Sequence, residues 1–599
     1  MTRAKTTTAS TGKVTKRSTK STGSTGTKKV SPYNKFMKNN LAQFKKDNPT
    51  LSHKDAFAGV AALWKNAKEN PKNQAKHSSS SAATMASTDR RPIKTMRESA
   101  FASLGVQAYP RYKHIPDRPI FSPQQIHERW DAELADGAKD ESALVVVQGR
   151  IRSKRESSKK LVFYDIEQDG GRHVVQAVVS EKRCTDPTHS TISFSDSNRI
   201  LLAGDIVRIT GFVGKTRIGE TSVFASRTPE LLAPCLHTIP TRSGLVDTQK
   251  RFRNRHLDLL VNPHARRALE TRAHVLRYLR RFLDSRGFIE VETPVLSASV
   301  GGAAAQPFIT QSVALGQDTP LFLRIAPELY LKQLVVGGLD RVYELGKQFR
   351  NEGIDADHNP EFTTCEFYQA YATMDDLMST TEDILRGMCH EVTGSMAVHV
   401  DDGGQSISID FGPSFQRIHV TDKLYELIPE LPQDLDGPGV LAELLSIASR
   451  RGIATPRPHT VPRLLDRLIG QLIEPLCQQP TFLVGHPAIM SPLSKEADAS
   501  KQTAARFELF VNGRELVNAY EELNDPNEQR RKFAAQARER NDQGDDEVPA
   551  PDAAFCDALE FGLPPTGGWG MGVDRVIGLL AGARHLRETV AFSLLKPST

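Results

Sequence analysis

Two stretches of the chain concentrate the carboxylates, guanidinium groups and phenols that could bind a charged substrate. In the first, residues 341–371, an aromatic strand leads to Arg350 and Glu352 at a turn, and a second strand carries Glu366 and Tyr368. Side chains two residues apart on a strand lie on the same face. We therefore predict that Glu366 and Tyr368 point into one pocket. A charged surface hairpin is the simpler alternative, but it would not need so many polar groups on hydrophobic strands.

The second stretch, residues 506–526, is rich in glutamate on otherwise apolar strands. Glu508 and Glu515 lie on either side of Asn512-Gly513, a pair typical of a hairpin turn. Buried carboxylates are costly unless they are paired or bound to metal, and two carboxylates combined with substrate phosphates suit Mg²⁺. An acidic, solvent-exposed hairpin is the alternative. Three further polar side chains alternate along the returning strand and are predicted to share one face: Asn518, Tyr520 and Glu522.

A third stretch, residues 561–576, reads FGLPPTGGWGMGVDRV. Its glycines predict a turn in which the backbone can approach a planar ligand closely. Asp574 and Arg575 then enter an apolar helix, and helix N-termini favour anions. A glycine-rich turn before a helix is a weak signal by itself, and it gains weight from the other two stretches.

The composition of the whole chain limits what these residues can belong to. It has 599 residues, of which 39% are hydrophobic and 25% are charged, which is typical of a globular protein with several domains. No apolar run reaches the ~18 residues that span a bilayer, so we expect no membrane partner. The six cysteines are scattered and form no CxxC pair, which argues against a disulfide framework or a cysteine zinc site. No P-loop or dinucleotide-binding glycine motif occurs, so bound ATP would need another kind of site.

Positive charge is concentrated at the N-terminus. Residues 1–48 contain twelve Lys and Arg and one acid, whereas the remaining chain has 66 basic and 70 acidic residues. Such an arm suits an anionic partner or import across a polarised membrane. The charge of this arm says nothing about the chemistry of the remaining chain.

The pattern along the chain predicts several domains before the chemical motifs begin. Residues 1–31 are expected to be a disordered basic arm. Apolar residues at three- and four-residue spacing predict a small helical module over 32–73, which resembles an HMG-box or YABBY segment; an amphipathic helical hairpin with a solvated basic face is the alternative. A serine-rich linker over 74–95 and a helical lead-in over 96–140 follow.

The remaining chain is predicted to hold the two main domains of an α+β protein. Five alternating runs over 141–236 fit a small antiparallel barrel of the OB type. Over 250–597, helical runs such as 265–287 alternate with strands predicted at 320–336, 341–350 and 363–372. These strands are mostly joined by hairpins, which favours helices flanking an antiparallel sheet.

The three chemical stretches, together with GFIEVETPVL at 287–296, resemble the motifs of class II aminoacyl-tRNA synthetases. The likeness is closest to lysyl-tRNA synthetases, through LRIAPELYLKQLVVGGLDRVYELG, FRNEGIDADHNPEFTTCEFY, RFELFVNGRELVNAYEELNDP and GLPPTGGWGMGVDR. The resemblance runs from about residue 100 to 597. It implies an antiparallel catalytic sheet flanked by helices, a homodimer interface around Pro294, and an OB-fold that reads the anticodon.

The resemblance also assigns roles to individual residues. It implies catalytic roles for Arg350, Glu352 and Arg575, and it gives Glu508 and Glu515 to Mg²⁺. Its ATP contacts are Arg350, Asn351, Glu352, His358, Asn359, Phe362, Glu508, Leu509, Gly572 and Arg575. Its lysine contacts are Gly302, Glu328, Glu366, Tyr368, Asn518, Tyr520 and Glu522. Its anticodon contacts in the barrel are Arg155, Phe163, Gln176 and Glu220, with a core role as the alternative for Phe163.

The expected function is therefore a lysine–tRNA ligase, which uses ATP to activate lysine and transfers it to the 3′ end of tRNA(Lys). Three carboxylates in the proposed amino-acid pocket suit a cationic substrate. One alternative is a nucleic-acid-binding protein with an inert synthetase fold, which would be expected to lose Arg350, Glu515 or Arg575; all three are present. Another is a relative that lysylates proteins, but those lack the barrel.

The sequence also suggests a location. The acid-poor start resembles an organellar transit peptide, and the segments TQKRFRNRHLDLLVN and RHLRETVAFSLLKP resemble those of fungal mitochondrial lysyl-tRNA synthetases. The mitochondrial matrix is the expected location, with the cytoplasm as the alternative. The basic module adds an expected extra contact with nucleic acid.

Overall fold

The structure, a computed structural model, describes residues 91–596 with short gaps at 115–117, 185–191, 241–243, 403–404, 456, 499–501, 546 and 549. Before residue 91 it describes only isolated positions, so the predictions for the arm, the helical module and most of the linker lie outside the described residues. The chain divides into two compact units, Met1–Thr238 and Ile239–Thr599. Each is described by itself.

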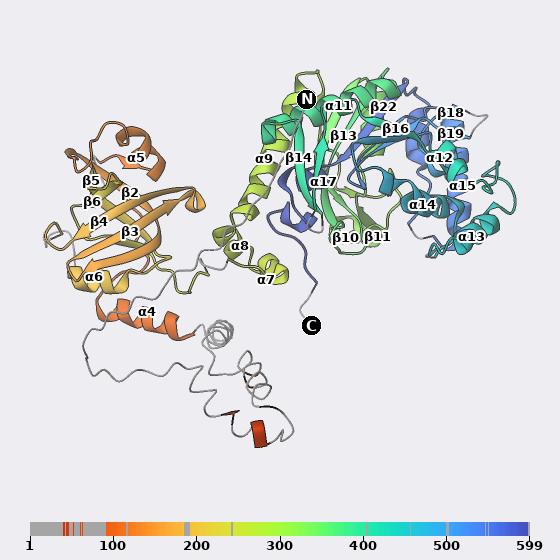
Figure 1. The fold of residues 1–599 in the computed structure, drawn as a ribbon. Coiled ribbons are helices and arrows are strands. Elements are labelled where there is room, and N and C mark those ends of the chain that lie inside the picture. The colour runs from red at the N-terminus through yellow and green to blue at the C-terminus, as the bar shows by residue number, and fades with distance from the viewer. Residues whose placement is uncertain are drawn as a thin grey trace, which may run out of the picture. The chain divides into compact units, whose positions relative to one another are not determined.

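The first unit is built around a barrel of five strands. Its long strand β2 pairs with β3 through its second half and with β5 through its first half, and the ring closes through β3, β4, β6 and β5. All pairings in the ring are antiparallel except that of β4 with β6. The elements are α4 (Arg91–Ser103), β1 (Ile120–Phe121), α5 (Pro123–Trp130), β2 (Lys139–Ser158), β3 (Leu161–Gln168), β4 (His173–Ser180), α6 (Phe194–Ile200), β5 (Ile206–Lys215), β6 (Thr221–Ala225) and β7 (Glu230–Ala233) (Figure 1).

Alternation along the barrel strands separates its core from its outer surface. On β3, Val162, Tyr164 and Ile166 are buried in the core, whereas Phe163 lies outside that core. Helix α4 is attached by a buried ion pair of 2.8 Å between Arg97 and Asp205. This helix begins at Arg91, so the predicted linker over 74–95 was too long at its C-terminal end.

The second unit contains an eight-stranded sheet in the order β16-β17-β20-β21-β22-β13-β12-β8. Every pairing from β17 to β12 is antiparallel, and only the two edge strands pair in parallel. Its strands are β8 (Ile289–Glu290), β12 (Arg341–Phe349), β13 (Glu361–Ala370), β16 (Gln416–His419), β17 (Thr481–Val484), β20 (Arg506–Val511), β21 (Arg514–Glu521) and β22 (Thr566–Gly572). The α+β class predicted from the sequence is therefore confirmed.

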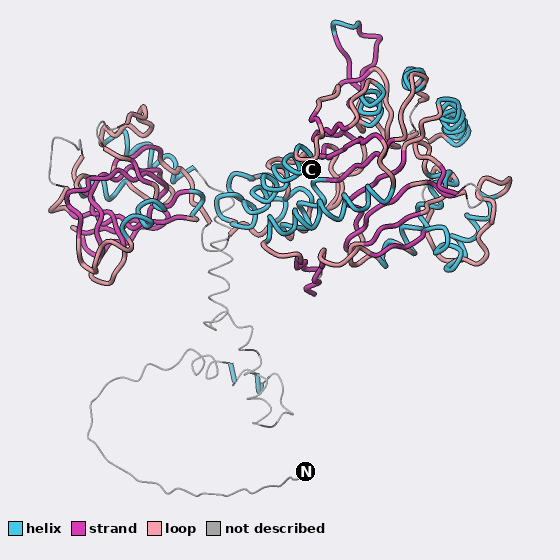
Figure 2. The backbone as a smooth tube through the Cα atoms, turned by 90° about the horizontal axis from the view of Figure 1, so that it is seen from above, coloured by secondary structure: helices cyan, strands magenta, loops and turns pink. Residues whose placement is uncertain are grey.

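Helices lie on both sides of this sheet (Figure 2). Helices α9, α11 and α17 share one large core with the sheet residues Cys365, Phe367, Val517 and Ala519. The alternate residues of the same strands face the other way. The helices are α7 (Thr248–Arg253), α8 (Arg255–Val261), α9 (Pro263–Asp284), α10 (Glu328–Val336), α11 (Met374–Thr393), α12 (Val420–Leu427), α13 (Val440–Arg450), α14 (Val461–Leu472), α15 (Pro526–Gln543), α16 (Ala553–Leu559) and α17 (Val573–Ala581).

Smaller strands and short helices complete the unit. A three-stranded sheet has the order β10-β11-β9, and two hairpins pair β14 with β15 and β18 with β19. Their bounds are β9 (Leu296–Ser297), β10 (Ile309–Ser312), β11 (Gly316–Leu323), β14 (Ala397–Asp402), β15 (Gln405–Asp410), β18 (Glu496–Asp498) and β19 (Thr503–Ala504), and the 3₁₀ turns include η3 (Glu474–Leu476) and η6 (Leu586–Glu588). No helix among the described residues is both long and apolar enough to cross a membrane.

Two predictions of local structure were wrong. The strand predicted over 320–336 is a strand only to Leu323, and α10 follows because Leu, Glu, Lys and Gln all favour helix. The glycine-rich part of the stretch 561–576, predicted to be a turn, is instead strand β22, which lies in the middle of the sheet. At Gly568 of this strand the neighbouring side chains leave no room for a Cβ.

Candidate active site

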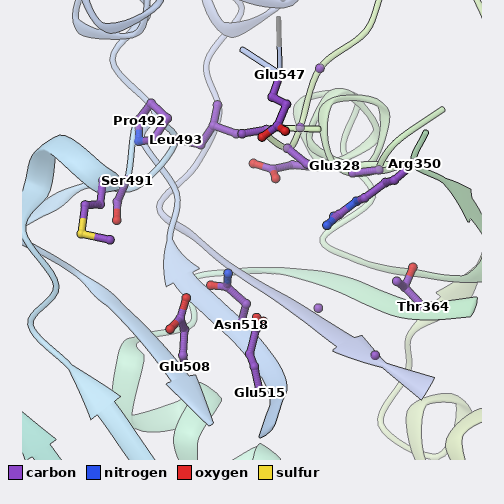
Figure 3. A pocket seen from close by; sticks show the side chains of 18 of the residues that line it. Glu328, Arg350, Thr364, Ser491, Pro492, Leu493, Glu508, Glu515, Asn518 and Glu547 are labelled. Atoms are coloured by element: carbon purple, nitrogen blue, oxygen red, sulfur yellow. The ribbon is translucent and has the colours of Figure 1, made fainter. Parts of the chain in front are cut away.

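A cavity of about 670 Å³ opens on the face of the sheet that α9, α11 and α17 do not cover. Strands β13, β20, β21 and β22 form its floor, and α10 and the loop 350–362 contribute its walls. In Figure 3, Glu508, Glu515 and Asn518 project from neighbouring strands toward Glu328 and Arg350 on the opposite side. Its size is that of a small-molecule site.

One end of the cavity carries two guanidinium groups and an aromatic ring. The Arg350 guanidinium lies 5.2 Å from the centre of the Phe362 ring, and its Nε is buried without a hydrogen-bond partner among the described residues. Arg575, at the start of α17, donates to Glu515 at 3.1 Å. A planar base and an anionic phosphate chain suit this combination of groups.

The loop that follows Arg350 is held in place at both ends. The backbone N–H of Arg350 donates to Pro360 at 2.9 Å, and that of Asn351 donates to Gln306 at 2.7 Å. Within the loop, Asp355 accepts hydrogen bonds from the backbone of Asp357 and His358. Arg514 of β21 pairs with Asp357 at 3.1 Å, so the loop is tied to the sheet.

Glu508 remains ionised although it is largely buried. Burial favours the neutral acid, but Arg506 and His486 beside it lower the pKa of Glu508 to about 2. His486 Nε2 lies 3.2 Å from the carboxylate, and Arg506 forms an ion pair with it. Glu508 therefore contributes a fixed negative charge to the cavity.

Two further acids lie near Glu508 and Glu515. Burial, reinforced by the negative charge of Glu508, raises the pKa of Glu474 to about 7. Asp466 of α14 has a raised pKa for the same two reasons. No group of three or more His, Cys, Asp or Glu residues in the described chain is arranged as a metal site. The pair Glu508 and Glu515 still fits Mg²⁺, which takes one or two carboxylates and completes its shell with phosphates and water.

The other end of the cavity is lined by carboxylates and phenols. Burial, together with the nearby Glu328 carboxylate, raises the pKa of Glu366 to about 8, despite a 3.2 Å hydrogen bond from Thr364. Tyr368 and Tyr520 line the same region. Acceptors of this kind suit an ammonium group.

Behind this wall lies a fully buried ion cluster. Lys332 of α10 has no exposed surface, and its Nζ lies 2.5 Å from Glu328 Oε1 and within ion-pair reach of Glu522. Glu522 is also fully buried, and neither of its oxygens accepts a well-aligned hydrogen bond from a described residue. Glu328 lines the cavity, whereas Lys332 and Glu522 do not.

Glycine at position 568 makes room for these side chains. A Cβ on Gly568 would lie 1.8 Å from Glu522 Oε1 and 2.7 Å from the Tyr368 ring. The glycines of β22 therefore bring polar side chains of β13 and β21 together above a flat strand. The sequence had predicted close approach of a ligand to this backbone, but not of the chain's own carboxylate.

Most residues predicted from the sequence lie together in the cavity. Those that line it are Gly302, Glu328, Arg350, Glu352, His358, Asn359, Phe362, Glu366, Tyr368, Glu508, Glu515, Asn518, Tyr520, Gly572 and Arg575. Asn351, Leu509 and Glu522 do not line it. The side chain of Leu509 lies in the core because it alternates with Glu508 on β20, so its assigned role rests on its backbone alone.

Sequence reasoning missed Lys332, Arg506, His486, Asp466 and Glu474. Each lies near a carboxylate that the sequence did indicate. Arg506 shares β20 with Glu508 and Lys332 shares α10 with Glu328, whereas the other three come from other segments. The spacing of Glu328 and Lys332, four residues apart, would have indicated a pair if the helix had been recognised.

The four residues predicted to bind an anticodon lie on adjoining strands of the barrel or next to them. Arg155 of β2 is the register partner of Phe163 on β3, and its guanidinium lies 5.8 Å from the centre of that ring. Gln176 of β4 donates to Glu220 at 2.8 Å. Phe163 is not part of the core, which removes the alternative role considered for it.

Comparison with known proteins identifies relatives of both the second unit and the longer chain. Residues 247–596 match the family model described as tRNA synthetases class II (D, K and N), and residues 15–77 match the C-terminal region of YABBY proteins. The chain is 46% identical over 473 residues to a lysine–tRNA ligase of Cladosporium cladosporioides, covering 77% of this chain and 78% of the relative. It is 45% identical over 460 residues to a probable cytoplasmic lysine–tRNA ligase of Encephalitozoon cuniculi, covering 75% and 87%. It is 40% identical over 509 residues to the mitochondrial lysine–tRNA ligase of Schizosaccharomyces pombe, covering 84% and 92%.

Proposed function

The chain belongs to the lysine–tRNA ligases of the class II tRNA synthetase family, and we propose how its cavity divides lysine and ATP between its two ends. The reaction has two steps. The carboxylate of lysine attacks the α-phosphate of ATP, which gives lysyl-adenylate and pyrophosphate. A hydroxyl of the 3′-terminal ribose of the tRNA then takes the lysyl group and AMP leaves.

We assign ATP to the end with Arg350, Phe362 and Arg575. Phe362 offers a ring to the adenine, and Arg350 contacts the α-phosphate, where negative charge builds up in the transition state. Arg575 binds a distal phosphate, for which it has to leave Glu515. The loop residues Glu352, His358 and Asn359 complete this end.

We assign Mg²⁺ to Glu508 and Glu515. The excess of carboxylates over cations in this region supports the assignment, because Asp466 and Glu474 have pKa values raised in part by Glu508 and Glu515. When bound, the ion neutralises charge on the phosphate oxygens. Arg506 and His486 keep Glu508 ionised and oriented beforehand.

We assign the amino acid to the end with Glu328, Glu366 and Tyr368. The two ammonium groups of the substrate lysine contact carboxylates there. The carboxylate of the substrate points toward Arg350 and the α-phosphate. Catalysis then rests on alignment and on charge stabilisation, since neither step requires a side chain to act as general base. The observation that carries this proposal is that one cavity is lined both by Arg350 and Arg575 with the Phe362 ring and by the carboxylates Glu328 and Glu366.

The test is ATP–pyrophosphate exchange by the purified full chain at pH 8. We expect exchange that depends on lysine and not on aspartate or norleucine. Glu366→Gln should raise the KM for lysine at least about tenfold, because a hydrogen bond to a charged group contributes ~1.5–3 kcal/mol. The KM for ATP is the internal control. Exchange that needs no lysine, or unchanged lysine kinetics in the variant, would contradict the assignment.

We infer that the barrel binds the anticodon through Arg155, Phe163, Gln176 and Glu220. A partly exposed ring beside hydrogen-bonding side chains suits stacked, single-stranded bases. The basic segment before residue 91 would add contacts with the RNA backbone.

We further propose that the enzyme is a homodimer joined around Pro294. Apolar side chains in and beside the three-stranded sheet are unusually exposed: Val295 40%, Leu296 51%, Ile309 68%, Val313 95% and Leu315 59%. A second copy would cover them. Light scattering should give twice the chain mass, and Ile309→Glu should give a monomer; Phe561→Glu, at an exposed apolar residue on α16's C-terminal side, is the control.

Finally, we propose the mitochondrial matrix as its location. The acid-poor arm and the 40% identity to the Schizosaccharomyces pombe mitochondrial enzyme support this; the 45% identity to the probable cytoplasmic enzyme of Encephalitozoon cuniculi supports the alternative. Sequencing the N-terminus of the protein isolated from purified mitochondria tests the location and shows how much of the arm is kept.

A further inference from the structure

Lys332 is a buried cation that the proposed reaction does not use. It lies within the core around α10, with no exposed surface and with the rings of Tyr520 and Phe555 each 5.7 Å from its Nζ. Burying an ammonium group is costly unless it is paired. Of its two partners, Glu328 lines the part of the cavity assigned to lysine, and Glu522, which the sequence resemblance had also given to lysine, lies behind it.

Lys332 cannot contact the substrate directly. Glu328, Tyr368 and Tyr520 line the cavity, whereas Lys332 and its partner Glu522 lie behind them. Among the described residues, Lys332 is also the only Lys or Arg that forms an ion pair with either glutamate. Any influence on lysine binding must therefore pass through those carboxylates.

The charges at this end do not balance without Lys332. Three carboxylates lie at or directly behind the site for a substrate with two ammonium groups: the buried Glu328 and Glu522 and the partly buried Glu366. One negative charge would remain when lysine is bound. The Lys332 ammonium supplies the missing positive charge, so three carboxylates face three cations in the complex.

We propose that Lys332 is a positioning and specificity-determining residue of the lysine site, which rests on the assignment of lysine to this end of the cavity. Its ammonium holds Glu328 and Glu522 in fixed places and neutralises the third carboxylate. The site is thereby matched to an amino acid with exactly one side-chain cation. Without Lys332, one carboxylate must keep a proton when lysine binds. That group is then neutral and no longer attracts an ammonium group of the substrate.

The groups around Lys332 define the expected pH behaviour. Glu328 is on its own helix and Glu522 follows β21. The titratable groups that act on these two carboxylates are Glu366 and Tyr368 of β13 and Tyr520 of β21. Burial alone would lower the pKa of Lys332, but the two carboxylates raise it, so Lys332 stays charged. Burial and Glu328 hold the pKa of Glu522 above its usual range, and loss of Lys332 would raise it further.

The test compares Lys332→Met with the wild-type full chain in lysine-dependent pyrophosphate exchange between pH 6.5 and 9. We expect the KM for lysine to rise at least about tenfold at pH 7, while the KM for ATP stays within about twofold. The ratio of the variant's KM for lysine to that of the wild type should become smaller as the pH rises. Lys423→Met removes a cation from a more exposed ion pair on α12 and is the matched control. A lysine KM that is unchanged, or that changes equally at every pH, would overturn the proposal.

A second variant keeps the proposal testable if Lys332→Met is unstable. Adding Glu522→Gln removes one negative charge, so the double variant should melt at a higher temperature than Lys332→Met alone. If the double variant melts no higher, Lys332 does not act through its charge and the proposal is overturned. If the wild-type chain itself shows no lysine-dependent exchange, the assigned function fails, which is a separate result.

Discussion

Glu366 shows how burial prepares a single carboxylate to bind a cation. With a pKa of about 8, it holds a proton at neutral pH in the free protein and must lose that proton when an ammonium group of lysine arrives. Lysine itself stays charged over this range. We therefore expect its dissociation constant to fall as pH rises, by up to about tenfold per pH unit below pH 8. Isothermal titration at several pH values measures this, and Glu366→Gln should flatten the profile.

The same raised pKa predicts the sign of a stability effect. The folded protein binds this proton more tightly than the unfolded chain, whose Glu has a pKa of about 4.3. Stability should therefore fall as pH rises from about 5 through about 8 in the absence of lysine. Saturating lysine should remove most of that fall, because it replaces the proton. A melting temperature that rises over this range without ligand would contradict the assignment of a neutral Glu366.

Individual residues were predictable from the sequence where one strand carries several of them. Alternation placed Glu366 with Tyr368, and the Asn512-Gly513 turn placed Glu508 near Glu515. His486 and Lys332 were not predictable, because each meets its carboxylate through tertiary packing between distant elements. A pattern along one strand contains no information about such a partner.

At the scale of elements, strand β22 depends on glycine more than any other strand in the sheet. Gly568→Ala would bring a Cβ to within 1.8 Å of Glu522 Oε1, so the carboxylate has to move. We expect the KM for lysine to rise at least about tenfold, as for loss of a charged hydrogen bond, with the KM for ATP little changed. Gly578→Ala on α17 meets only ordinary contacts, at 3.7 Å or more, and is the control. Equal effects on both substrates would indicate a general distortion of the sheet.

The barrel allows a separate prediction, because its outer face and its core alternate along β3. Phe163→Ala should remove ~1–3 kcal/mol of base stacking and lower the efficiency of tRNA(Lys) charging about five- to a hundredfold. Pyrophosphate exchange, which needs no tRNA, should stay nearly constant. Tyr109→Ala removes another exposed aromatic of the same unit and serves as the control. Normal charging by a folded Phe163→Ala protein would exclude the stacking role.

Helices and strands were predictable where the spacing of the apolar residues and the turn residues between them indicated the same element. The five barrel runs are rich in β-branched residues and are separated by glycine or polar turns, and each appears as a strand. Helix α10 was mistaken for a strand because it is apolar on nearly every side, so its sequence has no visible 3.6-residue period. The glycines of β22 have low strand preference, and the sheet forms there because both neighbours supply the hydrogen bonds.

At the scale of the whole molecule, the N-terminal segment and the catalytic unit should be separable. Deleting residues 1–84 removes 17 basic and three acidic residues, which is more than the chain's whole excess of positive charge, but no residue of the cavity or the barrel. Adenylate formation should stay near the wild-type rate, whereas affinity for tRNA should fall and its salt dependence should flatten. Filter binding at several salt concentrations measures this. Loss of adenylate formation in a folded, truncated protein would show that the segment supports the catalytic unit.

The central position of β22 has a consequence for how the chain is made. Its neighbour β13 ends at Ala370 and β22 begins at Thr566, so 195 residues are synthesised between two strands that finally lie side by side. At ~5–20 residues per second, β13 presents an unpaired edge for ~10–40 seconds, and β21, which ends at Glu521, for ~2–9 seconds. The ribosome thus releases the middle strand of the sheet after both of its flanks. Until then the emerging chain has two unpaired strand edges that can pair with other chains. A chaperone that shields such edges would be needed most during that interval.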